Sequence, residues 1–92
     1  MNEKESLSEL GKRITQERIN AELTQQSLAD KAAISLATLS KAERGYPMTT
    51  STLFRILDAL GQGSKLPDLL PEPAINPIAL RKLTKTRARV RS

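Results

Sequence analysis

The feature that most constrains the fold is a pair of short helix patterns separated by only three residues. Thr24 is a good N-cap for a helix over residues 25–32, and Ser35 is a good N-cap for a second helix over residues 36–44. The apolar positions fall on one side of each helix, at Leu28, Ala29 and Ala32 in the first and at Leu39 and Ala42 in the second. Because residues 33–35 leave room for only one tight turn, we expect the helices to cross steeply and the outer face of the second to project from the body.

The turn carries its own expectations. Ala33 directly follows the first helix, at a position where helices often end with a positive φ angle. A Cβ atom costs about 1 kcal/mol or more in that conformation, so we expect Ala33 to be strained. Ile34 should fill the core between the two helices, and Gly45 is a natural stop for the second one.

A longer helix is predicted before this pair. The spacing Ser6-x-x-Glu9 fits a capping box and predicts a helix over residues 7–20. Steps of three and four place one face of it at Leu7, Leu10, Ile14 and Arg18. Gly11 lies inside this helix at a cost of about 1 kcal/mol relative to alanine, which indicates close packing there.

A fourth helix is predicted after the pair. Thr49 or Thr50 should cap it, Gly61 should end it, and its apolar stripe consists of Leu53, Ile56, Leu57 and Leu60. Ser64 should then cap one more short turn over residues 65–70, with Pro67 in its first turn. The pattern predicts an all-α fold, in which residues 1–70 form a compact domain of four to five helices.

Residues 71–92 differ in character and are predicted to form an extended, basic C-terminal tail. Pro71, Pro73 and Pro77 break regular structure and favour extended backbone, and we expect disorder from Thr84 onward. Four residues of this tail are still large and apolar, so it could dock on the domain or on a second subunit: Ile75, Ile78, Leu80 and Leu83.

The positive charge of the chain is concentrated in the tail. The first 60 residues hold eight basic and eight acidic side chains, so the whole net charge of +5 arises after Leu60. A polyanionic partner is the natural interpretation of such an arm, and the alternative is a solvated end that aids solubility. The residues expected to contact phosphate are Arg81, Lys82, Lys85, Arg87, Arg89 and Arg91.

The composition argues against several other functions. The chain has no cysteine and no histidine, so disulfides, a conventional zinc site, a thiolate and the usual general base are all missing. We therefore expect no enzyme activity, no metal and no cofactor. Tyr46 and Phe54 are the only aromatic residues, too few for a platform that stacks single-stranded bases. The polar N-terminus and the lack of a long apolar run predict a cytoplasmic protein without membrane contact.

At residues 23–45 the sequence resembles the lambda repressor and Cro-like (XRE-type) helix-turn-helix family. The matching stretch reads Leu-Thr-Gln-Gln-Ser-Leu-Ala-Asp-Lys-Ala-Ala-Ile-Ser and continues Leu-Ala-Thr-Leu-Ser-Lys-Ala-Glu-Arg-Gly. The flanks agree as well, and the likeness covers residues 10–61, with Leu69-Leu70 as a candidate fifth helix. The sequence departs from the family in two places, since Ala33 stands where glycine is frequent and Leu36-Ala37 stand where polar residues are frequent.

The resemblance implies roles for individual residues. Gln25 is similar to the family's phosphate-clamping glutamine, and Arg18 and Glu43 match a pair that bridges two helices. The expected DNA-binding set is Gln25, Ser35, Leu36, Ala37, Thr38, Ser40, Lys41 and Arg44. Three alternatives stay open: Leu36 could fold back into the domain, Lys41 could be an ordinary surface lysine, and Gln25 could be only a good helix former.

The resemblance therefore implies a lambda-repressor-like DNA-binding domain that acts as a transcriptional regulator on double-stranded DNA. We expect a repressor that binds the major groove as a homodimer, built from the fourth and fifth helices or from residues 66–83. The tail is also similar to HipB-type antitoxins, through residues 69–73 and Asn76-Pro77, which implies autorepression and neutralisation of a HipA-like toxin kinase. A protein-interaction module that has lost DNA binding is the remaining alternative.

Overall fold

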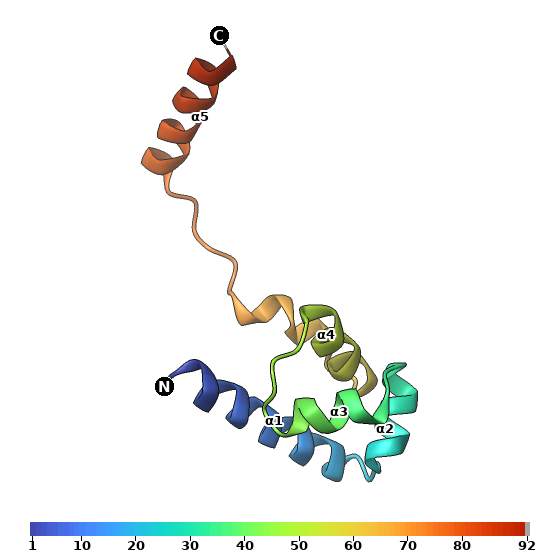
Figure 1. Cartoon of the computed structure of the whole chain (residues 1–92). Coiled ribbons are helices and arrows are strands. Elements are labelled where there is room, and N and C mark those ends of the chain that lie inside the picture. The colour runs from blue at the N-terminus through green and yellow to red at the C-terminus, as the bar shows by residue number, and fades with distance from the viewer. Residues whose placement is uncertain (92) are drawn as a thin grey trace.

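The computed structural model describes the backbone of residues 1–91 and the side chains of residues 1–84. Within these residues the fold is entirely helical, which confirms the predicted class (Figure 1). The elements in chain order are α1 (Glu3–Asn20), α2 (Gln25–Ala32), α3 (Leu36–Glu43), α4 (Thr50–Ala59), the 3-10 turns η1 (Gly63–Lys65) and η2 (Pro67–Leu69), and α5 (Pro77–Arg91).

Helices α1 to α4 enclose one small core. Its largest fully buried side chains are Leu28, Leu39 and Ile56, one from each of α2, α3 and α4, and Ile14 of α1 is 2% exposed. The other four residues of this hydrophobic core are small: Ala29, Ala32, Ala42 and Ala59. With alanine at half of the core positions the helices can approach closely, and the predicted inward faces of α2 and α3 are confirmed.

Hydroxyl side chains cap three of the helices. Thr24 Oγ1 accepts a hydrogen bond from Ser27 N at 3.0 Å, and Ser35 Oγ accepts one from Thr38 N at 3.0 Å, as predicted. Thr49, rather than Thr50, caps α4. These caps set the starting points of the helices on both sides of the turn.

The predicted start of α1 is wrong. The helix begins at Glu3 instead of residue 7, and Asn2 Oδ1 caps it by accepting from Glu5 N at 2.8 Å. Asn2 is as good a cap as Ser6, and starting earlier adds a turn of helix. The acidic Glu3 and Glu5 also lie in the first turn, where they stabilise the positive end of the helix dipole.

Four helices end in the same hydrogen-bonded turn. At each end the last turn closes with two backbone bonds, for example Ile34 N to Ala29 O at 3.0 Å and Ala33 N to Asp30 O at 3.2 Å. The residue inside the turn has positive φ in every case: Glu22 (59°), Ala33 (57°), Gly45 (84°) and Gly61 (75°). The left-handed conformation predicted for Ala33 is confirmed, whereas the sequence analysis missed Glu22.

The chain after α4 differs from the sequence prediction. Ser64 does not cap a helix, because it lies inside η1 and the two turns there have no side-chain cap. The backbone after Asn76 is also not extended, and α5 continues past Thr84, where the sequence predicted disorder. Asn76 explains the helix, because its Oδ1 accepts from Ile78 N at 3.1 Å and from Ala79 N at 3.3 Å. Pro77 is tolerated because it occupies the first helical position.

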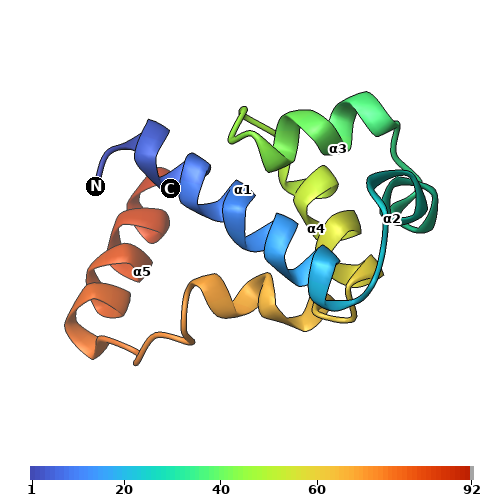
Figure 2. The ribbon, with the colours of Figure 1, turned by 90° about the horizontal axis from the view of Figure 1, so that it is seen from below.

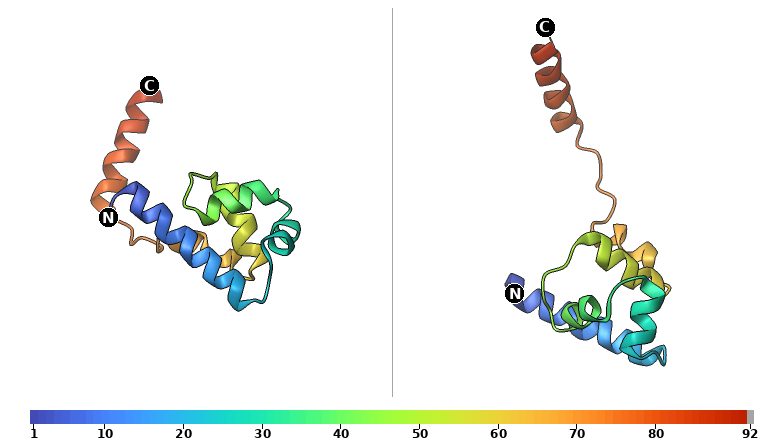
Figure 3. Two further views of the ribbon diagram at one scale, coloured as in Figure 1. Left: turned by 60° about the horizontal axis from the view of Figure 1, so that its bottom comes forward. Right: turned by 45° about the vertical axis from the view of Figure 1, so that its right-hand side comes forward.

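Helix α5 lies apart from the helical body. Residues 71–76 carry no regular structure and lead away from η2, as seen in Figure 1 and in both views of Figure 3. The side chains of Ile75, Ile78, Leu80 and Leu83 are 50–78% exposed. Among the described residues, no helix has the length and apolar character needed to cross a bilayer.

Candidate nucleic-acid interface

The turn between α2 and α3 is anchored to the body through two neighbouring residues. Ile34 is partly buried and packs against the core, which confirms its predicted role. The carbonyl of Ala33 accepts a hydrogen bond from Arg55 Nη1 of α4 at 3.3 Å. The side chain of Ile34 and the guanidinium group of Arg55 therefore both hold the turn on the body. These two contacts define the position at which α3 begins.

Helix α3 has one buried and one exposed face. Leu39 and Ala42 are 0% and 1% exposed, whereas Ala37 and Lys41 are exposed to solvent. Leu36 is 42% exposed, so its side chain is not part of the buried core. The outward face of α3 thus offers the cation of Lys41 beside small and apolar groups.

Polar groups surround this face at both ends of α3. At its start the hydroxyl of Ser35 donates to Thr38 Oγ1 at 2.8 Å and accepts from Thr38 N at 3.0 Å, so the cap satisfies one of the backbone N–H groups that begin the helix. At its other end the guanidinium of Arg44 lies over the ring of Tyr46, 4.8 Å from its centroid. Ser40 is half-buried between these ends.

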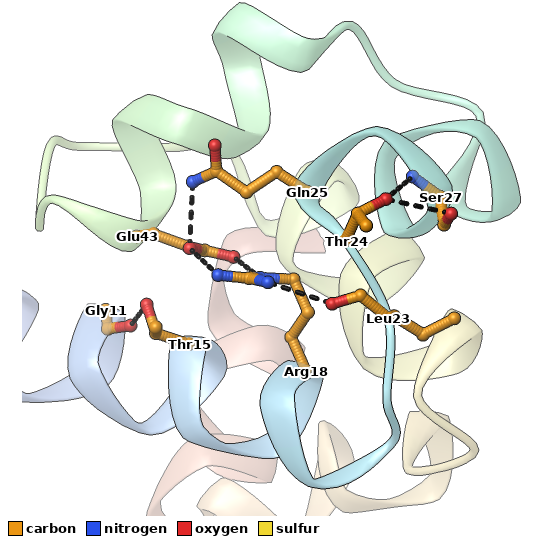
Figure 4. A network of polar contacts seen from close by, with 8 residues as sticks. All are labelled: Gly11, Thr15, Arg18, Leu23, Thr24, Gln25, Ser27 and Glu43. Atoms are coloured by element: carbon orange, nitrogen blue, oxygen red, sulfur yellow. Dashed lines mark hydrogen bonds and ion pairs between the residues drawn. The ribbon is translucent and has the colours of Figure 1, made fainter.

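A network of charged and amide groups joins α1, α2 and α3 (Figure 4). Arg18 Nε donates to Glu43 Oε2 at 2.8 Å, and Arg18 Nη2 donates to Glu43 Oε1 at 3.2 Å. Arg18 Nη1 also donates to the carbonyl of Leu23 at 2.9 Å. The two charged side chains are only 14% and 6% exposed, so this bidentate pair holds the end of α3 against α1. The predicted Arg18–Glu43 bridge is confirmed.

The network also sets the protonation of Glu43. Burial by itself raises the pKa of this carboxyl, but the hydrogen bonds and charge of Arg18 and the hydrogen bond from Gln25 lower it by more, and the pKa lies below its ordinary value. Glu43 is therefore ionised at neutral pH and stays a full partner for Arg18.

Gln25 belongs to this network through its side-chain amide. Its Nε2 donates to Glu43 Oε1 at 3.0 Å and so joins α2 to α3. An amide nitrogen has two N–H groups, so one hydrogen bond to Glu43 leaves a second donor. Gln25 is thus fixed at the N-terminal end of α2, beside the backbone N–H groups that begin this helix.

The tail residues expected to contact phosphate lie on α5. Arg81 and Lys82 are exposed on the described part of this helix. The side chains of Lys85, Arg87, Arg89 and Arg91 lie outside the described residues. None of the described tail residues belongs to the α2–α3 surface, so the sequence-predicted site residues divide into a group on the body and a group on the tail.

Sequence analysis missed two residues that position the site. Arg55 reaches the turn from α4, and Tyr46 supports Arg44. Arg55 lies in the flank that resembles the family, but the resemblance was not used to give it a role. Tyr46 follows a helix-ending glycine, and an arginine two residues earlier is a weak signal for such stacking.

The body with its tight turn and projecting α3 is a helix-turn-helix domain, the class of domain that places its second helix in a DNA groove. A family model described as helix-turn-helix matches residues 14–64, more than half of the chain. The chain therefore belongs to the lambda repressor-like helix-turn-helix family, which is a family of DNA-binding transcription regulators and not one of enzymes. A search among curated proteins found no match.

Proposed function

We propose that this protein is a sequence-specific transcriptional repressor that binds the major groove of double-stranded DNA as a homodimer. The observation that carries the proposal is the division of α3, with Leu39 and Ala42 in the core and Ala37 and Lys41 in solvent. A helix held in this way can enter a major groove without disturbing the domain.

The exposed residues of α3 divide into those that read bases and those that hold the backbone. Lys41 can donate to guanine O6 and N7, and Leu36 and Ala37 can contact a thymine methyl group. Ser40 adds a hydroxyl that can act as donor or acceptor. Ser35, Thr38 and Arg44 flank this set and are assigned to the DNA backbone, which positions the helix without reading the sequence.

Gln25 is assigned to a phosphate oxygen. Its bond to Glu43 orients the amide, so that binding does not have to order a free side chain. The N-terminus of α2 adds partial positive charge beside it. The same contact would support any DNA sequence, because a phosphate carries no base information.

The proposed function is tested by two substitutions that should behave differently. The preferred duplex is first selected from a random library with the full chain. Lys41→Ala should weaken binding to that duplex by about tenfold or more and relax the preference at one base pair of each half-site. Gln25→Ala should weaken the selected and random duplexes by similar factors.

A matched control separates the loss of a positive charge from the loss of a contact in the interface. Lys31 is an exposed lysine in the last turn of α2, so Lys31→Ala removes the same charge outside the assigned interface and should preserve the base preference. All titrations use one salt concentration, and circular dichroism establishes folding. If folded Lys41→Ala binds every duplex as the parent does, α3 does not read the groove and the protein-interaction module is the better account.

A second function, that of an antitoxin, is favoured by one observation on the tail. Its apolar side chains are exposed on a segment that lies apart from the body. A peptide that inserts into a groove of a partner protein has the same features. The HipB-like interpretation needs a HipA-like kinase encoded beside this gene. The test is growth on co-expression, where the full chain should neutralise that kinase and a chain ending at residue 70 should not.

A further inference from the structure

An apolar groove lies between α1, α4 and the turns that follow α4. Leu10 of α1, Leu53 and Leu57 of α4, and Leu69 of η2 line it, and it encloses about 340 Å³. In Figure 2, α3 lies on one side of α1 and residues 61–70 lie on the other. A partner bound at this groove would therefore leave the outward face of α3 free.

The rim of the groove is built from polar side chains that bond to one another. Gln62 Nε2 donates to Glu17 Oε2 at 2.6 Å, and Lys65 Nζ donates to Gln62 Oε1 at 2.9 Å. This chain of bonds joins α1 to η1 across one edge of the groove. The groove thus has a defined shape, with a carboxylate of α1 at its border.

The same chain carries an apolar segment whose large side chains are at least half exposed. Ile75, Ile78, Leu80 and Leu83 are 78%, 65%, 55% and 50% exposed, all within nine residues. Single exposed apolar residues are ordinary on protein surfaces, but four in one short segment indicate a contact surface. Asn76 caps the helix that carries Ile78, Leu80 and Leu83, and Ile75 directly precedes this cap. Arg81 adds a positive charge beside them.

The linker makes it difficult for this segment to reach its own groove. Leu69 lines the groove, and Pro71 follows only two residues later. Pro71, Pro73 and Pro77 hold their own φ angles and keep the preceding residues out of the helical region. Residues 71–76 therefore act as a semi-rigid spacer that carries α5 away from the body, as Figures 1 and 3 show.

We propose that residues 75–83 of a second copy of this chain occupy the groove, in a reciprocal exchange about a two-fold axis. Apolar side chains of the segment enter between Leu10, Leu57 and Leu69, and Arg81 meets the carboxylate at Glu17. Each dimer contains two identical groove–segment contacts, because the two-fold axis repeats the exchange. The inference rests on the proposed function and gives its dimer a specific interface.

The test uses the full chain and measures its oligomeric state by sedimentation over a range of concentrations. The groove variant is Leu69→Glu and the tail variant is Leu83→Glu, and both residues are at least half exposed, so neither change should disturb folding. Ile19→Glu is the matched control, since Ile19 is 53% exposed and lies outside both surfaces. The parent and the control should dimerise, and each variant should dimerise about tenfold or more weakly.

Mixing the two variants provides the decisive measurement. A mixed dimer has one intact groove facing one intact segment, so an equimolar mixture should dimerise more tightly than either variant alone. A mixture no better than the variants would overturn the exchange and indicate docking of the segment on its own body. A monomeric parent would also overturn it, as would a tail variant that dimerises like the parent.

The outcome is separable from that of the proposed function. If the exchange is wrong, a duplex with a single half-site is still read through α3. If the proposal that α3 reads DNA is wrong, the exchanged dimer still forms in the absence of DNA.

Discussion

The backbone carbonyl of Glu43 lies directly against Gly11. A Cβ atom at Gly11 would be 2.5 Å from Glu43 O and 2.8 Å from Ala42 O, closer than nonbonded atoms approach. The glycine therefore allows α1 to cross the C-terminal end of α3, and the Arg18–Glu43 pair forms about two turns further along α1. Contact between these helices, rather than the turn alone, holds the candidate recognition helix in place.

Gly11→Ala should destabilise the protein by about 2 kcal/mol. Alanine favours a helix over glycine by about 1 kcal/mol, but the methyl group would push against backbone atoms that cannot rotate away. Chemical denaturation measures the change, with Lys12→Ala as an exposed control in the same helix. A Gly11→Ala protein as stable as the parent would mean that α1 and α3 are further apart than described.

The two strained helix ends should respond in the opposite direction. Glu22 and Ala33 have φ angles of 59° and 57°, where glycine has no Cβ penalty. We expect Glu22→Gly and Ala33→Gly each to raise the free energy of unfolding by about 0.5–1 kcal/mol, less than the full penalty because glycine also loosens the unfolded chain. A clear loss of stability at either position, measured by thermal unfolding, would contradict the left-handed backbone there.

Acid should weaken the protein through Glu43. The pKa of this carboxyl is lowered in the folded state relative to its ordinary value of 4.5, so the folded protein binds a proton less readily than the unfolded chain does. The stabilisation is complete above about pH 5 and is lost as the pH falls through the folded pKa.

This prediction is checked by denaturation from pH 7 to pH 3 for the parent and Glu43→Gln. Glutamine does not titrate, so the variant should be less stable at pH 7 and should lose less stability on acidification. Equal slopes in the two proteins would show that other carboxyls cause the acid sensitivity.

The basic end of α5 should add affinity for DNA without adding sequence preference. Ending the chain after Thr84 keeps the apolar segment and removes Lys85, Arg87, Arg89 and Arg91. For every phosphate that these side chains neutralise, their removal should reduce the slope of log K against log salt by about 0.9. Selected and random duplexes should weaken by similar factors in salt titrations of the two chains. Binding that is unchanged after truncation would assign this end to another partner or to none.

The sequence by itself determined the local elements of this protein. Thr24 and Ser35 predicted the starts of α2 and α3, Ala33 predicted the left-handed turn, and the spacing of Leu28, Leu39 and Ile56 predicted the core faces. Each of these depends on a few neighbouring residues, through a cap, a backbone preference or a helical period, so it can be read without knowledge of the fold.

Only the tertiary structure decided which of two possible caps begins α1 and which groups distant in the sequence come into contact. Asn2 and Ser6 were both adequate caps for α1. The capping role of Asn76 is a local contact that the sequence analysis overlooked because of the neighbouring prolines, and packing did not decide it. The bond between Gln25 and Glu43 joins residues 18 positions apart, and the groove between α1, α4 and η2 exists only once these elements pack. Such contacts depend on the arrangement of whole helices, which local preferences do not encode.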